Sequence, residues 1–270
     1  MKVLRNINVL KKAINSISNL GFIPTMGGLH NGHVSLIKKS QKKCKKTLVS
    51  IYVNPKQFNN KTDYSIYPRN IKKDLSLLRK LKVDYVFTPH TKEIYAIKID
   101  KKIKLLKYQK ILCAKHRNGH FEGVLEVMDR FIKIIKPGYI FMGEKDYQQL
   151  FLVKNFIKNK YKSKIIPCKT IRDKNNVALS SRNYLLKKKD LNKASLIVNI
   201  LRKIKPLVKE KSSINKYLDL LKKDLSNKFK VKIEYLEFRN ENNLKKSLSK
   251  NKCRLFIAYY INKVRLIDNF

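Results

Sequence analysis

The sequence predicts an α/β fold, in which a parallel sheet carries helices on both faces, followed by a smaller C-terminal α+β domain. Short β-rich runs alternate with helical patterns over the first two-thirds of the 270 residues, and this alternation is typical of parallel sheets. After about residue 172 two helical segments precede three β-like runs. The hydrophobic fraction of 43% is that of a globular chain. We therefore expect one domain at 1–172 and a second at 173–270.

Five short segments are expected to form the strands of the first domain. They are Gly21–Thr25, Thr47–Val53, Val83–Thr88, Tyr139–Gly143 and Lys164–Cys168. Helical patterns lie between or after them, with apolar residues at the helical spacing of about 3.6; they cover Val34–Cys44, Ile71–Leu81, Phe121–Ile135 and Gln148–Lys158. Such a Rossmann-like sheet binds ligands beyond the carboxyl ends of its strands, so the loops that follow the strands are the candidate sites.

The second domain begins with two lysine-rich amphipathic segments, Lys187–Lys205 and Ser213–Lys228. Three β-like runs follow, at Val231–Phe238, Arg254–Tyr260 and Val264–Asp268. The last two runs are close enough for a hairpin. This order of elements predicts a small α+β domain.

The charge of the chain suggests a polyanion partner at first sight. Lys and Arg number 63 against 19 Asp and Glu, which gives a net charge of +44. Only 11 of the 63 are Arg, and the 52 Lys are spread along the whole chain. A nucleic-acid surface is expected to cluster its cations and to use Arg for bidentate phosphate contacts. Abundant Lys, Asn and Ile instead indicate A/T-rich codon usage, so we expect no specific nucleic-acid partner.

Cysteine spacing and hydropathy indicate the cellular compartment of the protein. Four cysteines lie far apart with no Cys-x-x-Cys pair, so we expect neither a disulfide framework nor a zinc site, and a reducing, cytoplasmic location. The amino terminus lacks the continuous apolar core of a secretory signal. The uncharged stretch Ala13–Ile37 contains a proline and four glycines, which a membrane-spanning helix would not tolerate. We expect no membrane association.

The loop after the first predicted strand, Pro24–His33, carries the clearest chemistry. Adjacent Gly27 and Gly28 allow close approach of backbone to a ligand, and the helix that opens at Gly32 favours an anion. Because His30 and His33 are three residues apart, both imidazoles can face one phosphate. A Gly-rich turn with incidental histidines and a His-x-x-His metal site are the alternatives.

Two further loops follow strands. Asn54–Phe58 follows the second predicted strand. Side-chain amides at this place suit a small polar substrate, although Asn-Pro is also common in turns. Gly143–Gln149 ends the fourth strand; there Lys145 can reach phosphate, and Asp146 can meet a ribose or magnesium or can simply cap a helix.

Two other segments supply cations. Arg117 lies in the segment Arg117–Gly123, which is equally well explained as a capped loop. Arg172 precedes Leu179-Ser180-Ser181-Arg182-Asn183, where two hydroxyls and a guanidinium could clamp an anion, although such a run alone is common in loops.

Together these segments resemble the nucleotidyltransferase superfamily that includes the class I tRNA synthetases, and more finely the pantoate–β-alanine ligase family. The motifs that carry the resemblance occur in order along almost the whole chain; they are Pro24–His33, Val53–Phe58, Tyr67–Arg69, Arg117–Gly123, Gly143–Gln149, Arg172–Asn183 and Arg265–Asn269. A related nucleotidyltransferase with another small substrate and a basic nucleic-acid-binding protein are the competing hypotheses.

The resemblance implies a two-step ligase. Pantoate and ATP with Mg²⁺ would form a pantoyl adenylate, and β-alanine would then attack it to give pantothenate and AMP. ATP is a substrate here, no organic prosthetic group is implied, and no residue is assigned to a metal. A homodimer is implied as the usual state of the family.

The resemblance also implies roles for residues. His33 would be the general acid, with His30 as its partner and Lys145 on phosphate. Pantoate would be held by Gln57 and Gln149, with Asn54 nearby. Residues implied in ATP binding are Met26, Gly27, Gly28, Leu29, His30, Asn31, Gly32, His33, Gly143, Glu144, Lys145, Asp146, Ile171, Leu179, Ser180, Ser181 and Arg182. Asp146 would lie towards the ribose, Ile171 at the adenine, and Leu179–Arg182 over the triphosphate as part of a lid domain.

The chain departs from the family pattern at four places. Gly28 replaces the usual Ala, and Asn118 replaces Pro. Asn175-Asn176 stands in place of Asp-Gly, and Asn tolerates the left-handed backbone angles that such a turn requires. Glu126 occupies a position that usually holds a small or hydroxyl residue, and the sequence offers no account of it.

Overall fold

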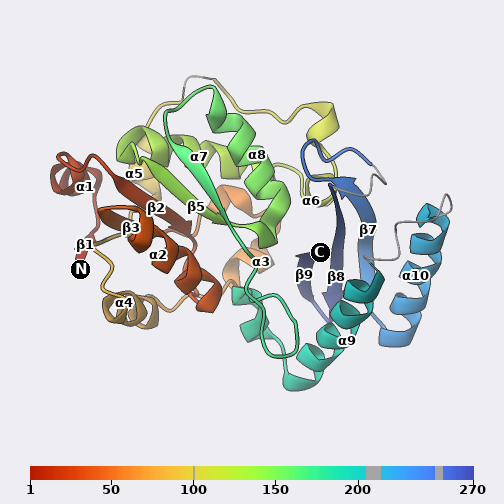
Figure 1. Ribbon diagram of the computed structural model, residues 1–270. Coiled ribbons are helices and arrows are strands. Elements are labelled where there is room, and N and C mark those ends of the chain that lie inside the picture. The colour runs from red at the N-terminus through yellow and green to blue at the C-terminus, as the bar shows by residue number, and fades with distance from the viewer. Residues whose placement is uncertain (100, 205–213, 247–251) are drawn as a thin grey trace. The chain divides into compact units, whose positions relative to one another are not determined.

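The computed structural model describes residues 1–99, 101–204, 214–246 and 252–270 (Figure 1). Within it the chain forms two compact units, Met1–Thr170 and Ile171–Phe270. The first unit is built on a parallel sheet and the second on an antiparallel one.

The first unit contains a six-stranded sheet with the order β1-β4-β3-β2-β5-β6, in which every strand pair is parallel. The strands are β1 (Lys2–Leu4), β2 (Leu20–Thr25), β3 (Lys46–Ile51), β4 (Tyr85–Phe87), β5 (Tyr139–Gly143) and β6 (Lys164–Cys168). The predicted parallel sheet is therefore confirmed, with an additional edge strand at the amino terminus that the sequence did not predict.

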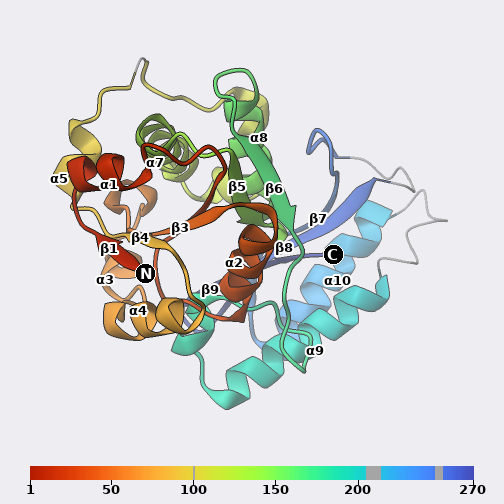
Figure 2. The same cartoon turned by 60° about the vertical axis from the view of Figure 1, so that its left-hand side comes forward.

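Helices cover both faces of this sheet, as Figures 1 and 2 show. The longer ones are α1 (Ile7–Ile14), α2 (Asn31–Lys43), α4 (Ile71–Lys80), α5 (Thr91–Ala96), α7 (His120–Ile135) and α8 (Tyr147–Lys158). Short helices are α3 (Lys61–Ser65), α6 (Cys113–His116) and the 3-10 turns η1 (Pro55–Gln57), η2 (Lys107–Gln109) and η3 (Glu144–Asp146).

Neighbouring residues of β2 show why two layers of helices are needed. Side chains of successive strand residues point to opposite faces. Ile23 packs in one cluster with Ile37 of α2 and Leu78 of α4. The ring of Phe22 instead meets Phe131 of α7 with centroids 5.6 Å apart. All five side chains are nearly or fully buried, so the strand is apolar on both faces and must be covered on both.

The topology creates a switch point at β2. From β2 the chain passes through α2 to β3 on one side, whereas β5, which pairs with the other side of β2, leads through α8 to β6. Ligands of open α/β sheets bind at such a point, beyond the carboxyl ends of the strands. The loops that start at Met26 and Glu144 therefore border the same crevice.

The second unit contains three antiparallel strands, β7 (Lys232–Asn240), β8 (Cys253–Ile261) and β9 (Val264–Asn269), in the order β7-β8-β9. Helices α9 (Lys188–Ile204) and α10 (Ile214–Phe229) and the turn η4 (Ser181–Leu185) complete it. This is the predicted α+β architecture; the expected helix ends at Lys205 and Ser213 lie outside the described residues.

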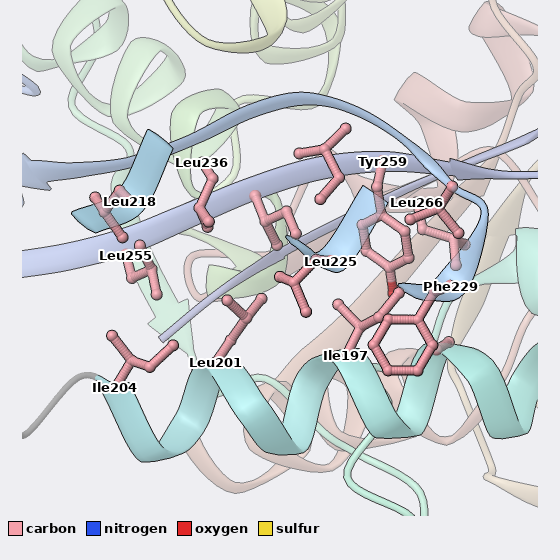
Figure 3. Packing of buried hydrophobic residues seen from close by; sticks show 14 of the residues in the cluster. Ile197, Leu201, Ile204, Leu218, Leu225, Phe229, Leu236, Leu255, Tyr259 and Leu266 are labelled. Carbon is pink, nitrogen blue, oxygen red and sulfur yellow. The ribbon is translucent and has the colours of Figure 1, made fainter. Parts of the chain in front are cut away.

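The core of the second unit lies between its helices and its sheet (Figure 3). Ile197 and Leu201 of α9 and Leu225 of α10 belong to one buried cluster with Leu255 and Tyr259 of β8. The lysines of the two helices lie outside this cluster, which explains why lysine-rich segments are compatible with a folded unit.

Candidate active site

His30 and His33 form a reciprocal cap at the amino end of helix α2, with His30 at the N-cap and His33 in the first turn. The N–H of Gly32 donates to Nδ1 of His30 at 3.1 Å, and the N–H of His30 donates to Nδ1 of His33 at 3.3 Å. A ring nitrogen that accepts a hydrogen bond carries no proton, so each neutral ring bears its proton on Nε2. The ring centroids are 4.2 Å apart. The loop thus presents two adjacent imidazoles, each with a defined Nε2–H donor.

Both imidazoles are neutral at neutral pH. Burial, followed by the positive charge of Lys145, lowers the pKa of His30 from 6.5 to about 4, against an opposing effect of Asp146. Burial, followed by the neighbouring His30, lowers the pKa of His33 to about 3. The influence of Lys145 and Asp146 on both rings also shows that the loop after β5 lies beside the loop after β2.

The glycine loop itself is held by a carboxylate that the sequence did not single out. Gly27 and Gly28 have φ angles of +82° and +62°, a region that glycine occupies without strain. The N–H groups of Gly28 and Leu29 donate to the Asp74 carboxylate at 2.9 and 2.8 Å. These two N–H groups are therefore engaged by a side chain of the protein. The contact spans about 45 residues of sequence, and no local pattern reveals it.

Beyond β3, Asn54 and Gln57 differ in what their side chains do. Asn54 is fully buried; its Oδ1 accepts from the Tyr95 hydroxyl at 2.8 Å, and its Nδ2 donates to the Gly123 carbonyl at 3.1 Å. Both bonds hold the Asn54 side chain to the protein scaffold. Gln57 is 8% exposed, and within the described part of the chain its side-chain amide has no hydrogen-bond partner.

The backbone of Gln57 is fixed from helix α7. His120 Nδ1 lies 2.6 Å from the Gln57 carbonyl oxygen, and Arg117 lies 2.9 Å from His120 Nε2. Because a guanidinium can only donate, Nε2 accepts and Nδ1–H donates to the carbonyl. Arg117 also reaches the same carbonyl at 3.4 Å. The Arg117–Gly123 segment therefore anchors the loop that carries Gln57.

Glu126, which no sequence pattern explains, also supports this loop. Its carboxylate lies 3.5 Å from Lys56 and 3.5 Å from Arg130. Both cations also lie over the ring of Tyr95, at 4.3 and 4.5 Å from its centroid. Tyr95 in turn donates to Asn54, so Glu126 belongs to the cluster that positions η1.

The loop after β5 shows a second contrast between amides. Gln148 is buried and donates to the carbonyls of Gln109 and Ile111 at 3.3 and 2.7 Å. Gln149 is partly exposed, and no hydrogen bond of the described residues involves its amide. Asp146 occupies the N-cap position of α8 without a side-chain capping bond and pairs with Lys145 at 3.3 Å. Of the alternatives for Asp146, capping of α8 by its side chain is therefore not seen.

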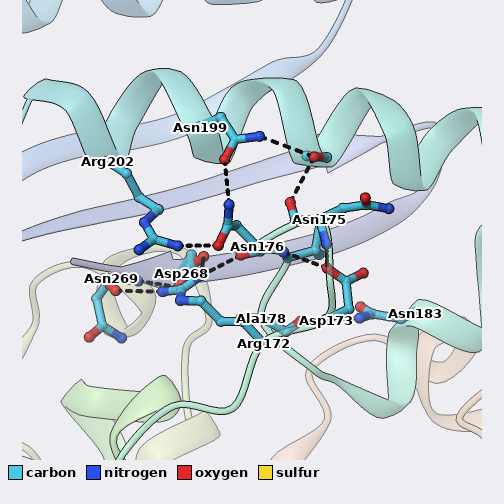
Figure 4. Close-up of polar contacts among 12 residues, drawn as sticks. Arg172, Asp173, Asn175, Asn176, Ala178, Asn183, Asn199, Arg202, Asp268 and Asn269 are labelled. Atoms are coloured by element: carbon cyan, nitrogen blue, oxygen red, sulfur yellow. Dashed lines mark hydrogen bonds and ion pairs between the residues drawn. The ribbon is translucent and has the colours of Figure 1, made fainter.

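In the second unit, Ile171–Leu179 forms a small hairpin, closed by an Arg172–Ala178 bridge (Figure 4). The Arg172 guanidinium donates two hydrogen bonds to the Asp268 carboxylate, at 2.7 and 2.8 Å. Arg172 therefore anchors the hairpin to the residue Asp268. Asn176 has a φ of +67°, as the turn requires, and its amide also bonds Asn199 and Arg202 of α9. Asn175-Asn176 in place of the family's Asp-Gly is thus compatible with the turn. The Asn176 side chain also makes contacts that glycine could not make.

The predicted clamp residues follow this hairpin. Ser180 caps η4 by accepting from the Arg182 N–H at 3.3 Å. Leu179, Ser180 and Arg182 are partly exposed, whereas Ser181 is only 6% exposed. Ile171, at the base of the hairpin, is partly exposed.

Three features define the class: a parallel α/β sheet, a switch point between β2 and β5, and a histidine-capped glycine loop at that point. They make the first unit an open α/β domain with a His-x-Gly-His motif at its switch point, where ligands of such sheets bind. Within that class, a family model described as Pantoate-beta-alanine ligase matches residues 2–270. The chain belongs to the pantoate–β-alanine ligase family.

Individual relatives agree with this assignment. A pantothenate synthetase of Francisella philomiragia is 38% identical over 277 residues, covering 100% of this chain and 95% of the relative. The crystal structure of the pantoate-beta-alanine ligase from Francisella tularensis, complexed with beta-gamma ATP and beta-alanine, is 39% identical with a TM-score of 0.85, and the match covers 100% and 97% of the two chains. A relative of known structure from Thermus thermophilus is 28% identical, with coverage of 100% and 99% and a TM-score of 0.92.

Proposed function

We propose that this protein joins pantoate to β-alanine in an ATP-dependent reaction that yields pantothenate, AMP and pyrophosphate. A carboxylate resists attack by an amine until one of its oxygens becomes part of a good leaving group. In the first step a pantoate carboxylate oxygen attacks the α-phosphorus of ATP, and pyrophosphate leaves. In the second step the amine of β-alanine attacks the acyl carbon of the adenylate, the acyl–oxygen bond breaks, the amine loses a proton and AMP leaves.

The observation that carries this proposal is the contrast between engaged and unengaged amides. Asn54 and Gln148 hold backbone groups of the protein, whereas the amides of Gln57 and Gln149 have no partner among the described residues. Gln57 is 8% exposed and Gln149 is partly exposed, so both amides remain available to a ligand. Gln57 and Gln149 follow β3 and β5, the two strands that flank β2. Hydroxyl and carboxylate groups of pantoate would satisfy both amides.

The two histidines enter the proposal as neutral hydrogen-bond donors. Negative charge builds up on the α-phosphate as the carboxylate attacks and pyrophosphate leaves. The Nε2–H groups of His33 and His30 would stabilise that charge, and Lys145 would add a full positive charge. The acid role expected of His33 is thereby refined: the donor is a neutral imidazole, because burial lowers the pKa of His33 to about 3.

The remaining contacts to ATP are assigned from the family motifs. We assign Met26–His33 and Gly143–Asp146 to ATP, with Asp146 towards the ribose and the Ile171 backbone at the adenine. Leu179–Arg182 would bind the triphosphate from the second unit, which would act as the lid domain. Exclusion of water by such a lid would protect the adenylate from hydrolysis.

Mg²⁺ would enter as part of the substrate, bound to the ATP phosphates. We further propose that the chain forms a homodimer in the cytoplasm; analytical ultracentrifugation would distinguish one chain from two. Among the described helices none is long and apolar enough to cross a membrane.

The glutamine assignment has a direct test by steady-state kinetics. Gln149→Ala should raise the KM for pantoate by roughly 10–100-fold, since a hydrogen bond to a charged group is lost, while the KM for ATP changes by less than about twofold. The control is Gln41→Ala, because the Gln41 amide on α2 donates to the Leu81 carbonyl outside the site. Equal increases in both KM values would contradict the assignment.

A further inference from the structure

Asp74 is a buried carboxylate that the proposed reaction does not use. It lies in the first turn of α4 and is 3% exposed. Its Oδ2 accepts from the Gly28 N–H at 2.9 Å, and its Oδ1 accepts from the Leu29 N–H at 2.8 Å. Within the described residues no cation pairs with it. The two backbone N–H groups therefore provide its stabilisation, one for each oxygen.

The loop is shaped around this carboxylate. Gly27 and Gly28 both have positive φ, so the N–H groups that follow them converge on one anion, as in the backbone concavities that bind phosphate. A Cβ atom on Gly27 would lie 2.9 Å from Asp74 Oδ2. Glycine at this position therefore leaves room for the carboxylate as well as permitting the backbone angle.

The anchored residue is adjacent to the proposed catalytic groups. Leu29, bonded to Asp74, immediately precedes His30, whose ring caps α2 and whose N–H donates to His33. Any shift of Leu29 is passed through one peptide link to His30 and through the capping bond to His33. The orientation of both Nε2–H donors thus depends on the carboxylate.

We propose that Asp74 is a positioning residue for ATP activation: it fills the anion-binding concavity of the glycine loop with an internal carboxylate and thereby fixes His30 and His33. This inference rests on the proposed function. It assigns the phosphate contacts of the glycine loop to the imidazole donors, beside Lys145 of the loop after β5, because the N–H groups of Gly28 and Leu29 are occupied by Asp74.

The test replaces the carboxylate and then supplies it again. Asp74→Ala should lower kcat on the order of 10²-fold, as expected for a displacement of about 1 Å of catalytic groups, with the KM for pantoate unchanged. Formate, which matches the deleted carboxylate, should restore part of the activity, whereas formamide should not. Hydrogen exchange of the Gly28 and Leu29 amides should accelerate in Asp74→Ala and slow again with formate.

Asp84→Asn is the matched control. Asp84 also accepts a backbone N–H, that of Thr47 at 2.9 Å, but at the amino end of β3. This variant should keep the kcat of the natural chain. If Asp74→Ala does not fold, Asp74→Asn provides the same exchange measurement, because its amide can accept only one of the two N–H bonds.

The outcomes separate the two claims. Full activity of Asp74→Ala or Asp74→Asn, unchanged exchange of the two amides, or equal rescue by formate and formamide would overturn the role of Asp74. Absence of ligase activity in the natural chain would instead overturn the proposed function, while the exchange measurement would still test whether Asp74 fixes the loop.

Discussion

Gly123→Ala is expected to disturb the pantoate-binding loop through a single added methyl group. Gly123 lies in α7 against η1, and a Cβ there would be 2.3 Å from the Lys56 carbonyl oxygen and 3.1 Å from the Gln57 nitrogen. Ordinary contact begins at 3.4 Å, so helix and loop must separate by about 1 Å at the closest pair. Both neighbours are backbone atoms, so no side-chain rotation can relieve the contact.

Three effects determine the change in the free energy of unfolding: two are destabilising and one is stabilising. Overpacking costs about 1–3 kcal/mol, and stretching the 3.1 Å bond from Asn54 to the Gly123 carbonyl costs about 1 kcal/mol. Ala in place of Gly in a helix returns about 1 kcal/mol. The net loss in the free energy of unfolding is about 1–3 kcal/mol. A shift of Gln57 by about 1 Å should lower kcat/KM for pantoate on the order of 10²-fold.

Thermal unfolding and steady-state kinetics measure both effects. The melting temperature should fall by roughly 2–4 °C for each kcal/mol lost. Gly138→Ala is the control, because the nearest atoms to a Cβ there are 3.9 Å away; its stability should change by less than about 0.5 kcal/mol. A folded Gly123→Ala variant with the melting temperature and pantoate kinetics of the natural chain would refute the argument that this contact places Gln57.

Two further predictions concern charged groups. Asp268→Asn should destabilise the protein by about 3 kcal/mol in urea titrations, because it leaves the Arg172 guanidinium without its carboxylate partner; a loss below about 0.5 kcal/mol would contradict the anchoring role. For His30 and His33 the folded pKa values, about 4 and 3, lie below the unfolded value of 6.5. The unfolded state therefore takes up protons first, so the stability due to these rings is present above about pH 6.5 and is lost as the pH falls towards 4. After allowance for partial exposure, the free energy of unfolding should fall by about 1 kcal/mol for each ring as the pH is lowered from 7 to 5. A His30→Gln/His33→Gln variant should lose this pH dependence, and an unchanged slope would disprove it.

Local patterns were sufficient to predict most of the sheet. The predicted segments Tyr139–Gly143 and Lys164–Cys168 match β5 and β6 at both ends, because β-branched and aromatic runs are bounded there by polar or turn residues. Strand β1 was not predicted, since three residues give no periodicity and the strand is fixed by pairing with β4, about 80 residues away.

The candidate site was predictable only where a residue acts through its own local motif. The positions of His30 and His33 followed from the spacing after a strand. The difference between Asn54 and Gln57 did not, because it depends on Tyr95 and Gly123, which reach Asn54 only in the folded chain. The same holds for Asp74, whose partners are about 45 residues away in sequence.

The net charge has a simpler explanation than a polyanion partner. The proposed chemistry uses few cations, chiefly Lys145 and Arg182, whereas Arg117 and Arg172 hold protein groups. The spread lysines would at most raise the local concentration of anionic substrates.

Transfer of oxygen from pantoate to AMP tests the central claim most directly. The natural chain is incubated with ATP, Mg²⁺, β-alanine and pantoate labelled with ¹⁸O in its carboxylate, and the products are analysed by mass spectrometry. We expect pantothenate and AMP in equal amounts, with one ¹⁸O atom in the phosphate of each AMP. Unlabelled AMP, or ADP as the nucleotide product, would contradict it.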